Sequence, residues 1–385
     1  MIAAGSSLSS SATYADGRRS TEPYGPLAEP DANGLRLPAG FVSRVVARSG
    51  DVVAGSGYTW HEQPDGGACF PTPGGFVYVS NSEVGFGRGG VGALRFDRGG
   101  IVTDAYRILD GTNRNCSGGV TPWGTWLSCE EAGADGHVFE CDPMGERSAR
   151  MIPALGSFNH EAVEVVERAR MLFLSEDDPD GRFYRFVPTR WPRLDAGRLQ
   201  AARVHDDGRV EWVDVSPNEP ARGDDTTPFD GGEGLASWMA DVFLATKNDR
   251  RIWRYDIATS RIEVIHDCVA TPDTILDTVD NLTVDPATGD LFVAEDGSTQ
   301  DLGIISTDRA SGDLDIAALV RFEGHDGSEV TGPAMSPDRS TLVVSSQRGT
   351  DGRGITYAIT GPFRDALLNG ARSSSLRSAV RASLR

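Results

Sequence analysis

Apolar and polar positions along the chain follow a layout that recurs six times. Each copy has an apolar strand, a turn, and a second, mostly apolar strand that ends in Ser or Ala, and in most copies a polar or Gly-rich turn leads into a third strand. The second strands end at Ser80, Ser128, Ser175, Ala245, Ala294 and Ser345, which are spaced by 48, 47, 70, 49 and 51 residues. The chain therefore contains a repeat of nearly constant length with one insertion.

Repeats of antiparallel meanders with this period predict an all-β fold, a β-propeller with six blades. Such a fold also accounts for the 46 glycines and 21 prolines, which are typical of many turns between short strands. The long interval places an insertion of loops and a short helix around residues 189–230. Residues 41–53 alternate in polarity and are expected to supply an outer strand that closes the ring against the last blade. The innermost strands are expected to begin near Ala68, Ser117, Glu161, Glu233, Asn281 and Gly332.

The ends of the chain differ from its middle. Residues 1–34 are Ser-rich and predict a flexible lead-in, residues 35–363 form the propeller, and residues 364–385 form a tail with a short helix and a basic end. The lead-in lacks the basic and apolar regions of a complete secretory signal, so it is either the remnant of one or a disordered cytosolic tail. The location is accordingly expected to be periplasmic or secreted in the first case and cytoplasmic in the second.

Charge and composition exclude several classes of partner. Lys and Arg number 37 against 56 Asp and Glu, a formal net charge of −19 that phosphate backbones and anionic lipids would repel. No stretch approaches the roughly 20 apolar residues of a transmembrane helix. We therefore expect neither nucleic-acid duplex binding nor a membrane span, and the sequence does not indicate an oligomeric state. The five cysteines are an odd number, so at least one is outside any internal disulfide.

Acidic residues gather where the repeat places the mouth of the central channel. Glu161 and Glu233 stand at the starts of inner strands, and Glu176 and Glu295 directly follow second strands. Carboxylates in a partly dehydrated site would have to take up protons unless a cation neutralised them. The oxygen ligands suit calcium, and the thiol of Cys129 suits a transition metal such as iron or zinc. The candidate metal ligands are Glu83, Cys129, Glu130, Glu161, Glu176, Glu233, Asp280, Asn281 and Glu295.

A simpler interpretation stands beside this one. Each acidic residue taken alone is as readily explained as a solvated residue in a turn, and Cys129 as a small residue of the core. The alignment of several acids at equivalent positions of the repeat favours a site.

Several phrases of the sequence together resemble the PhoX-type alkaline phosphatases, a family of exported six-bladed propellers. They run from about residue 40 to about residue 360 and comprise TPWGTWLSCEE (121–131), FNHEAV (158–163), GEG (232–234), DNL (280–282) and TGPAMSPD (331–338). The resemblance implies hydrolysis of phosphate esters at a centre of iron and calcium. It also implies that Cys129, Glu161 and Glu233 are the catalytic iron ligands and that the remaining candidates bind calcium or share ligands.

One position departs from the family pattern. The resemblance leads us to expect an arginine two residues before the Glu of the Glu-Gly pair, where it would bind the substrate phosphate, but this chain has Gly231. The candidates to replace it are Arg88, Arg114, Arg222 and Arg348.

The leading hypothesis is thus a metal-dependent phosphoester hydrolase that acts on a small-molecule phosphate ester. One alternative is a calcium-dependent lactonase or esterase of the six-bladed type, which needs no thiolate. The other is a propeller scaffold that binds a partner and uses calcium only for structure.

Overall fold

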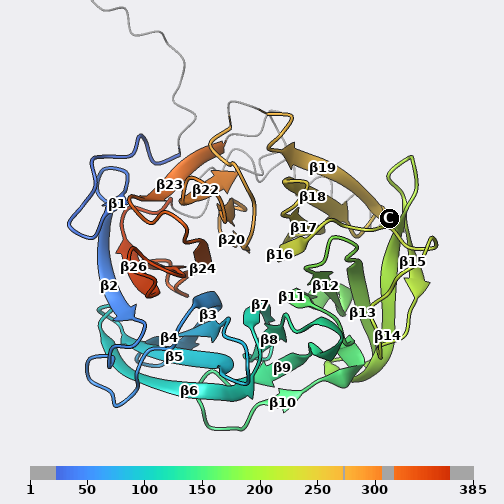
Figure 1. Ribbon diagram of the computed structural model, residues 1–385, viewed down its shortest axis with the longest axis horizontal. Helices are drawn as coiled ribbons and strands as arrows, with labels where there is room; N and C mark the ends of the chain where they lie inside the picture. Colours follow the sequence, from blue (N-terminus) through green and yellow to red (C-terminus); the bar gives the residue numbers. More distant parts are fainter. Residues whose placement is uncertain (1–22, 272–273, 306–315, 365–385) are drawn as a thin grey trace, which may run out of the picture.

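Six antiparallel sheets form a ring in the computed structural model, which describes residues 23–271, 274–305 and 316–364 (Figure 1). Each sheet directs one strand toward the middle of the ring and is followed along the chain by the next sheet. The prediction of an all-β, six-bladed propeller is confirmed. In the described residues the only helical segments are short 3-10 turns, η1 (Gly133–Asp135), η2 (Pro153–Leu155) and η3 (Glu167–Ala169). None of them approaches the length or apolar character of a membrane-spanning helix.

Every blade is a meander of four strands, numbered here from the centre outward. The inner strands are β3 (Pro64–Thr72), β7 (Asn115–Val120), β11 (His160–Val166), β16 (Gly232–Trp238), β20 (Leu282–Val284) and β24 (Val330–Met335). The second strands are β4 (Gly75–Ser82), β8 (Trp126–Glu130), β12 (Met171–Glu176), β17 (Asp241–Thr246), β21 (Leu291–Ala294) and β25 (Thr341–Ser346). The third strands are β5 (Gly89–Asp97), β9 (Val138–Cys141), β13 (Phe183–Arg190), β18 (Arg251–Asp256), β22 (Asp301–Ile305) and β26 (Ile355–Thr360). The outer strands are β6 (Val102–Thr112), β10 (Arg150–Met151), β14 (Arg193–Val204), β19 (Arg261–Asp267), β23 (Ile316–Phe322) and β2 (Val42–Arg48).

The core lies between neighbouring blades. Because each blade is covered on both faces, its second strand is apolar on both faces, and in β17 every residue is buried. Leu172 and Leu174 of β12 pack with Leu127 of β8 and Val163 of β11 in one buried cluster. Truncating such a leucine to alanine typically costs about 2–5 kcal/mol of stability. The apolar repeat seen in the sequence is thus the packing surface between blades.

The two ends of the described chain close the ring. Strand β2 pairs antiparallel with β26, so the sixth blade combines residues from both ends, as the alternation in residues 41–53 predicts. A short strand, β1 (Leu35–Arg36), adds to the outer edge of the fifth blade beside β23. Before it, the carboxylate of Asp31 accepts hydrogen bonds from the N–H groups of Asn33 and Leu35. Residues 1–22 and 365–385, where we expect most of the lead-in and the helical tail, lie outside the described residues.

The insertion differs from the prediction. Residues 189–230 contain no helix; instead β14 is long and a fifth strand, β15 (Val210–Asp214), pairs with it. The predicted helix was wrong because residues 199–213 alternate with period two across a turn at Gly208, whose φ of +79° suits glycine. The pairing of β14 with β13 then overrides the helix preference of its Ala, Leu and Arg residues. The third blade is therefore five-stranded.

Candidate metal centre

The residues of the site are positioned by irregularities at the starts of the inner strands. Strands β3, β7, β11 and β16 each carry a β-bulge, in which two residues face a single residue of the second strand. The first residue of these four bulges is Asp65, Cys116, Glu161 and Glu233 in turn. In the fifth blade Asp280 occupies the corresponding place, and its N–H bonds the carbonyl of Ala294 at 3.0 Å. We call these five residues the inner ring.

Glycines follow two members of the inner ring because adjacent inner strands come very close there. A Cβ on Gly66 would lie 2.5 Å from the Cα of Ser117, and one on Gly234 would lie 2.3 Å from the backbone nitrogen of Leu282. The Asp-Gly and Glu-Gly pairs of the sequence are therefore explained by an acid that serves the site and a glycine that lets the next blade approach.

A second set of residues follows the ends of the second strands. These residues, which we call the outer ring, are Glu83, Glu131, Asp177, Lys247, Asp296 and Gln347. Five of them come directly after the last residue of β4, β8, β12, β17 or β25, and Asp296 comes two residues after β21. Since the end of a second strand pairs with the start of its inner strand, the two rings are adjacent.

Residues of the two rings converge into three groups whose potential ligand atoms lie within 4.8 Å of one another. One of the groups includes a thiol, and the other two contain only carboxylates. The groups are Asp65, Glu83 and Cys116; Glu161, Glu233 and Asp280; and Asp280, Asp296 and Glu329. Glu329 directly precedes β24, so all six blades contribute to one or other group except through their outer strands.

The electrostatics of the site favour bound cations. Glu161 is fully buried, and neither of its carboxylate oxygens has a hydrogen-bond partner by geometry among the described residues. Burial raises its pKa well above the ordinary value, and the charges of Asp280 and Asp65 raise it further. Burial likewise raises the pKa of Asp280 to about 7. An unpartnered buried carboxylate among other carboxylates, with a thiol beside them, is a donor set that fits metal ions.

Four of the predicted ligands are brought together in these groups: Glu83, Glu161, Glu233 and Asp280. Cys129 is not. It faces the first two residues of its blade's bulge from β8 and is fully buried in the apolar cluster of Leu127, Val138 and Phe158. Burial raises the pKa of its thiol far above the ordinary value. The thiol that enters the site is that of Cys116, which lies 3.6 Å from Oδ2 of Asp65.

The other predicted ligands are occupied by local hydrogen bonds. Glu130 accepts hydrogen bonds from the N–H groups of Asn113 and His137, and Glu295 accepts them from those of Asp277 and Asp301. These two acids stabilise loops. Asn281 donates its amide to Asp280 at 2.8 Å, and its amide oxygen accepts from the N–H of Gly332 at 2.9 Å. It therefore orients Asp280 from behind.

Glu176 is neutralised by a cation of the protein. The guanidinium of Arg222 donates two hydrogen bonds to its carboxylate, at 2.9 and 3.0 Å, and the hydroxyl of Tyr184 donates a third at 2.7 Å. Arg222 belongs to the loop that follows β15, so this contact fastens the end of the insertion beside the mouth of the ring.

Sequence reasoning missed Asp65, Cys116, Asp296 and Glu329. The first two were missed because alignment by the small residues alone places Ala68 and Ser117 at the positions that the bulges give to Asp65 and Cys116. The Asp65-Gly66 pair, similar to Glu233-Gly234, was the signal that could have found Asp65.

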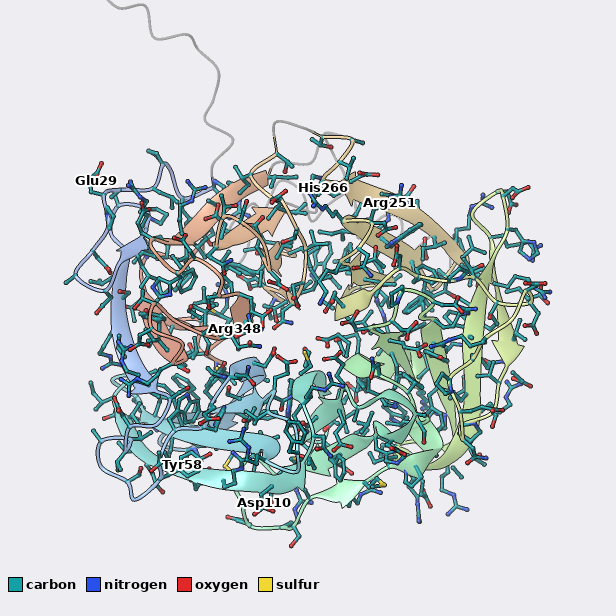
Figure 2. The ribbon with its side chains drawn as sticks, in the orientation of Figure 1. Glu29, Tyr58, Asp110, Arg251, His266 and Arg348 are labelled. Atoms are coloured by element: carbon teal, nitrogen blue, oxygen red, sulfur yellow. The ribbon has the colours of Figure 1, made fainter. Side chains whose placement is uncertain are left out.

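The arginine candidates lie in different surroundings. Arg88 is paired with Glu62, and Arg222 with Glu176. Arg348 lies at the inner edge of its blade in Figure 2, with Nη2 3.2 Å from Oε1 of Glu329. Arg114 is exposed and makes no hydrogen bond or ion pair through its guanidinium within the described parts of the chain. Its charge lowers the pKa of Glu131, which burial raises overall to about 7.

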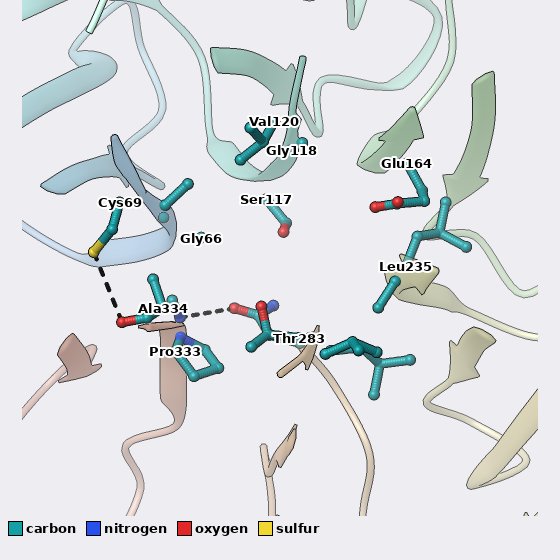
Figure 3. Close-up of a pocket in the computed structure, with 18 of the residues that line it drawn as sticks. Gly66, Cys69, Ser117, Gly118, Val120, Glu164, Leu235, Thr283, Pro333 and Ala334 are labelled. Carbon is teal, nitrogen blue, oxygen red and sulfur yellow. Dashed lines mark hydrogen bonds between the residues drawn. The ribbon is translucent and has the colours of Figure 1, made fainter. Parts of the chain in front are cut away.

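Below the inner ring lies a cavity of about 270 Å³ (Figure 3). Its lining runs along the inner strands, from Gly66 and Ser117 beside the ring to Val120 and Met335 at the other end of β7 and β24. Glu164 projects toward it in Figure 3 and accepts a hydrogen bond from Ser237. Burial raises the pKa of Glu164 to about 7.

Comparison with known proteins identifies relatives of this chain. The model of the family described as alkaline phosphatase PhoX matches residues 101–135, 132–237 and 264–349, more than half of the chain. PhoX from Pseudomonas fluorescens, solved in complex with vanadate, a transition state analogue, is 18% identical with a TM-score of 0.71, over 87% of this chain and 97% of that one. A gluconolactonase from Xanthomonas campestris is 16% identical with a TM-score of 0.49, over 89% of this chain and 99% of that one. No curated protein matches the sequence.

Proposed function

This chain belongs to the alkaline phosphatase PhoX family and is a phosphoester hydrolase, and we propose that it hydrolyses small phosphate esters at the metal centre formed by the inner and outer rings. The observation that carries the location is the convergence of buried carboxylates with the thiol of Cys116, among which Glu161 has no hydrogen-bond partner. Such a donor set binds cations, and phosphoryl transfer needs positive charge near the phosphate oxygens.

The donor chemistry of the groups favours two kinds of metal. The group of Asp65, Glu83 and Cys116 adds a sulfur ligand to carboxylates and would hold a transition metal, which we propose to be iron. The two groups that share Asp280 offer only oxygen and would hold calcium. When bound, these ions supply the positive charge that attracts the phosphate and assists attack on phosphorus.

The protein itself supplies position. The bulges hold the inner-ring side chains at the starts of rigid strands, and Asn281 fixes the orientation of Asp280 through two hydrogen bonds. Carboxylates of the outer ring keep the mouth acidic, so a phosphate ester is expected to bind only after cations have neutralised this charge. A metal-free protein should therefore bind neither phosphate nor ester.

The experiment is metal analysis of protein purified without chelator, combined with hydrolysis of an aryl phosphate between pH 7 and pH 10. We expect calcium together with a transition metal, and turnover that a chelator abolishes. Calcium alone, with lactone but no phosphate ester hydrolysed, would support the lactonase alternative. Bound metal with no turnover of any ester would support the scaffold.

We also propose an exported, periplasmic or secreted location, which the family resemblance supports. Fractionation of cells expressing the full-length gene product tests it, and activity confined to the cytoplasm would contradict it.

A further inference from the structure

One position of the outer ring breaks the pattern set by the other blades. At this position the first, second, third and fifth blades carry a carboxylate, and the sixth carries Gln347, but the fourth carries Lys247. A lysine among carboxylates at equivalent radius makes one side of the mouth positive. The ammonium group is therefore a feature of the site that the repeat does not account for.

The surroundings of Lys247 tie it to the catalytic groups. Its Nζ lies 2.5 Å from Oε1 of Glu233 and 3.4 Å from Oδ2 of Asp177, so it contacts one member of each ring. An ammonium group has three donors, and these two contacts leave one. The side chain is 30% exposed, whereas that of Glu233 is 1% exposed. The charged end of Lys247 thus lies between the buried acid and the open mouth.

The backbone places Lys247 beside the glycine that departs from the family pattern. The N–H of Lys247 donates to the carbonyl of Gly231 at 2.8 Å across the start of the fourth blade. Gly231 has a φ of +69°, and a Cβ there would lie 2.8 Å from Nδ2 of Asn248. A side chain at position 231 would therefore be strained and crowded, whereas the cation at position 247 reaches the same acid from the neighbouring strand.

We propose that Lys247 binds a non-bridging oxygen of the substrate phosphate and supplies the fixed positive charge that position 231 lacks. This inference rests on the proposed function. Because Glu233 is also a proposed metal ligand, a cation that shares its charge weakens the hold on Lys247 and leaves the ammonium to a phosphate above it. Lys247 is then a binding residue for the phosphate in ester and product alike.

Inorganic phosphate is the probe, because it tests binding separately from turnover. We expect Lys247→Met, loaded with the metals of the wild type, to bind phosphate roughly 10- to 100-fold more weakly by calorimetry and by competitive inhibition, as the loss of one charged hydrogen bond predicts. The KM for an aryl phosphate should rise similarly. Lys247→Arg should recover most of the affinity because it keeps the charge.

Arg88→Met is the matched control, since it removes the same charge from an exposed pair with Glu62. It should leave phosphate affinity within twofold of the wild type. Phosphate affinity within twofold of the wild type for Lys247→Met would overturn the proposal, and so would unchanged affinity per loaded site together with a loss of bound metal, which would assign the lysine to metal retention. Wild-type protein that holds metal but neither binds phosphate nor hydrolyses esters would instead refute the proposed function itself, and with it this inference.

Discussion

The Sγ of Cys116 lies 3.6 Å from Oδ2 of Asp65, although the two residues come from different blades. Both are the first residues of bulges in adjacent inner strands. The equivalent position in the next blades is occupied by Glu161 and Glu233. A local irregularity of the backbone, repeated from blade to blade, thus aims successive potential ligands at one point.

Cys116→Ser is expected to lose the transition metal and to lower the phosphatase rate by at least 100-fold, because a hydroxyl is a poor replacement for a thiolate ligand. Elemental analysis and hydrolysis of an aryl phosphate measure the two effects. Cys129→Ser is the matched control. It should retain metal and activity but lose about 1–3 kcal/mol of stability, since its hydroxyl would be buried among apolar side chains. The reverse pattern, with metal lost only from Cys129→Ser, would restore the assignment made from the sequence.

Removal of metal should destabilise the protein increasingly as the pH rises. The pKa of Glu161 is raised by burial and neighbouring acids, so its contribution to stability is fully present below the ordinary carboxyl value of 4.5 and is lost as the pH rises toward its pKa in the folded protein. Glu161→Gln should therefore stabilise the metal-free protein by about 1–3 kcal/mol at pH 8. Thermal unfolding in chelator at pH 5 and pH 8 tests this. Equal melting temperatures for both proteins at pH 8 would show that Glu161 carries no such cost.

Arg222→Met should destabilise the protein by roughly 3–5 kcal/mol, because it leaves the buried carboxylate of Glu176 without its cation. The double variant Arg222→Met with Glu176→Gln should recover most of this loss, since the unpaired charge is gone. Urea unfolding of the single and double variants measures the coupling. Additive losses would mean that the two side chains do not depend on each other.

Glu164 provides a pH-dependent effect away from the proposed ligands. Its pKa is raised by burial to about 7 from 4.5, so stability is fully present below pH 4.5 and is lost between about pH 4.5 and pH 7. Glu164→Gln should be more stable than the wild type by ~1–2 kcal/mol at pH 8, a value reduced because the side chain faces the cavity, and equal to it at pH 4.5. Denaturant unfolding across this range tests the prediction. A constant difference at all pH values would exclude titration of Glu164 as the cause.

The repeat could be predicted because the packing between blades requires apolar second strands at regular intervals. Leu172 and Leu174 of β12 lie on opposite sides of a pattern that all six copies share, and the same intervals located the inner strands. The closing strand β2 could also be predicted from its alternation. Fold and blade number thus follow from a single physical requirement, the covering of each blade by the next.

The site could be predicted only in part, because a bulge adds one residue without changing the apolar pattern. Glu161 and Glu233 stand in blades where the small residue and the bulge give the same register, so they were found. In the second blade the register differs by one residue, and Cys129 was chosen in place of Cys116. Which acids are held by hydrogen bonds, as Glu176 is by Arg222, depends on a loop distant in sequence and is not visible in any local pattern.

The pairing of β2 with β26 also governs the order in which the protein can be made. About 300 residues separate Arg48 from Ile355, so at a synthesis rate of roughly 5–20 residues per second the first strand waits ~15–60 s for its partner to leave the ribosome. Throughout that time the open ring exposes an unpaired edge and the apolar flanks of two blades. Until the sixth blade is complete, Glu329 and Gln347 are also missing from the mouth. Ring closure is thus a late event, and a nascent chain stalled before residue 355 would be a target for chaperones and proteases.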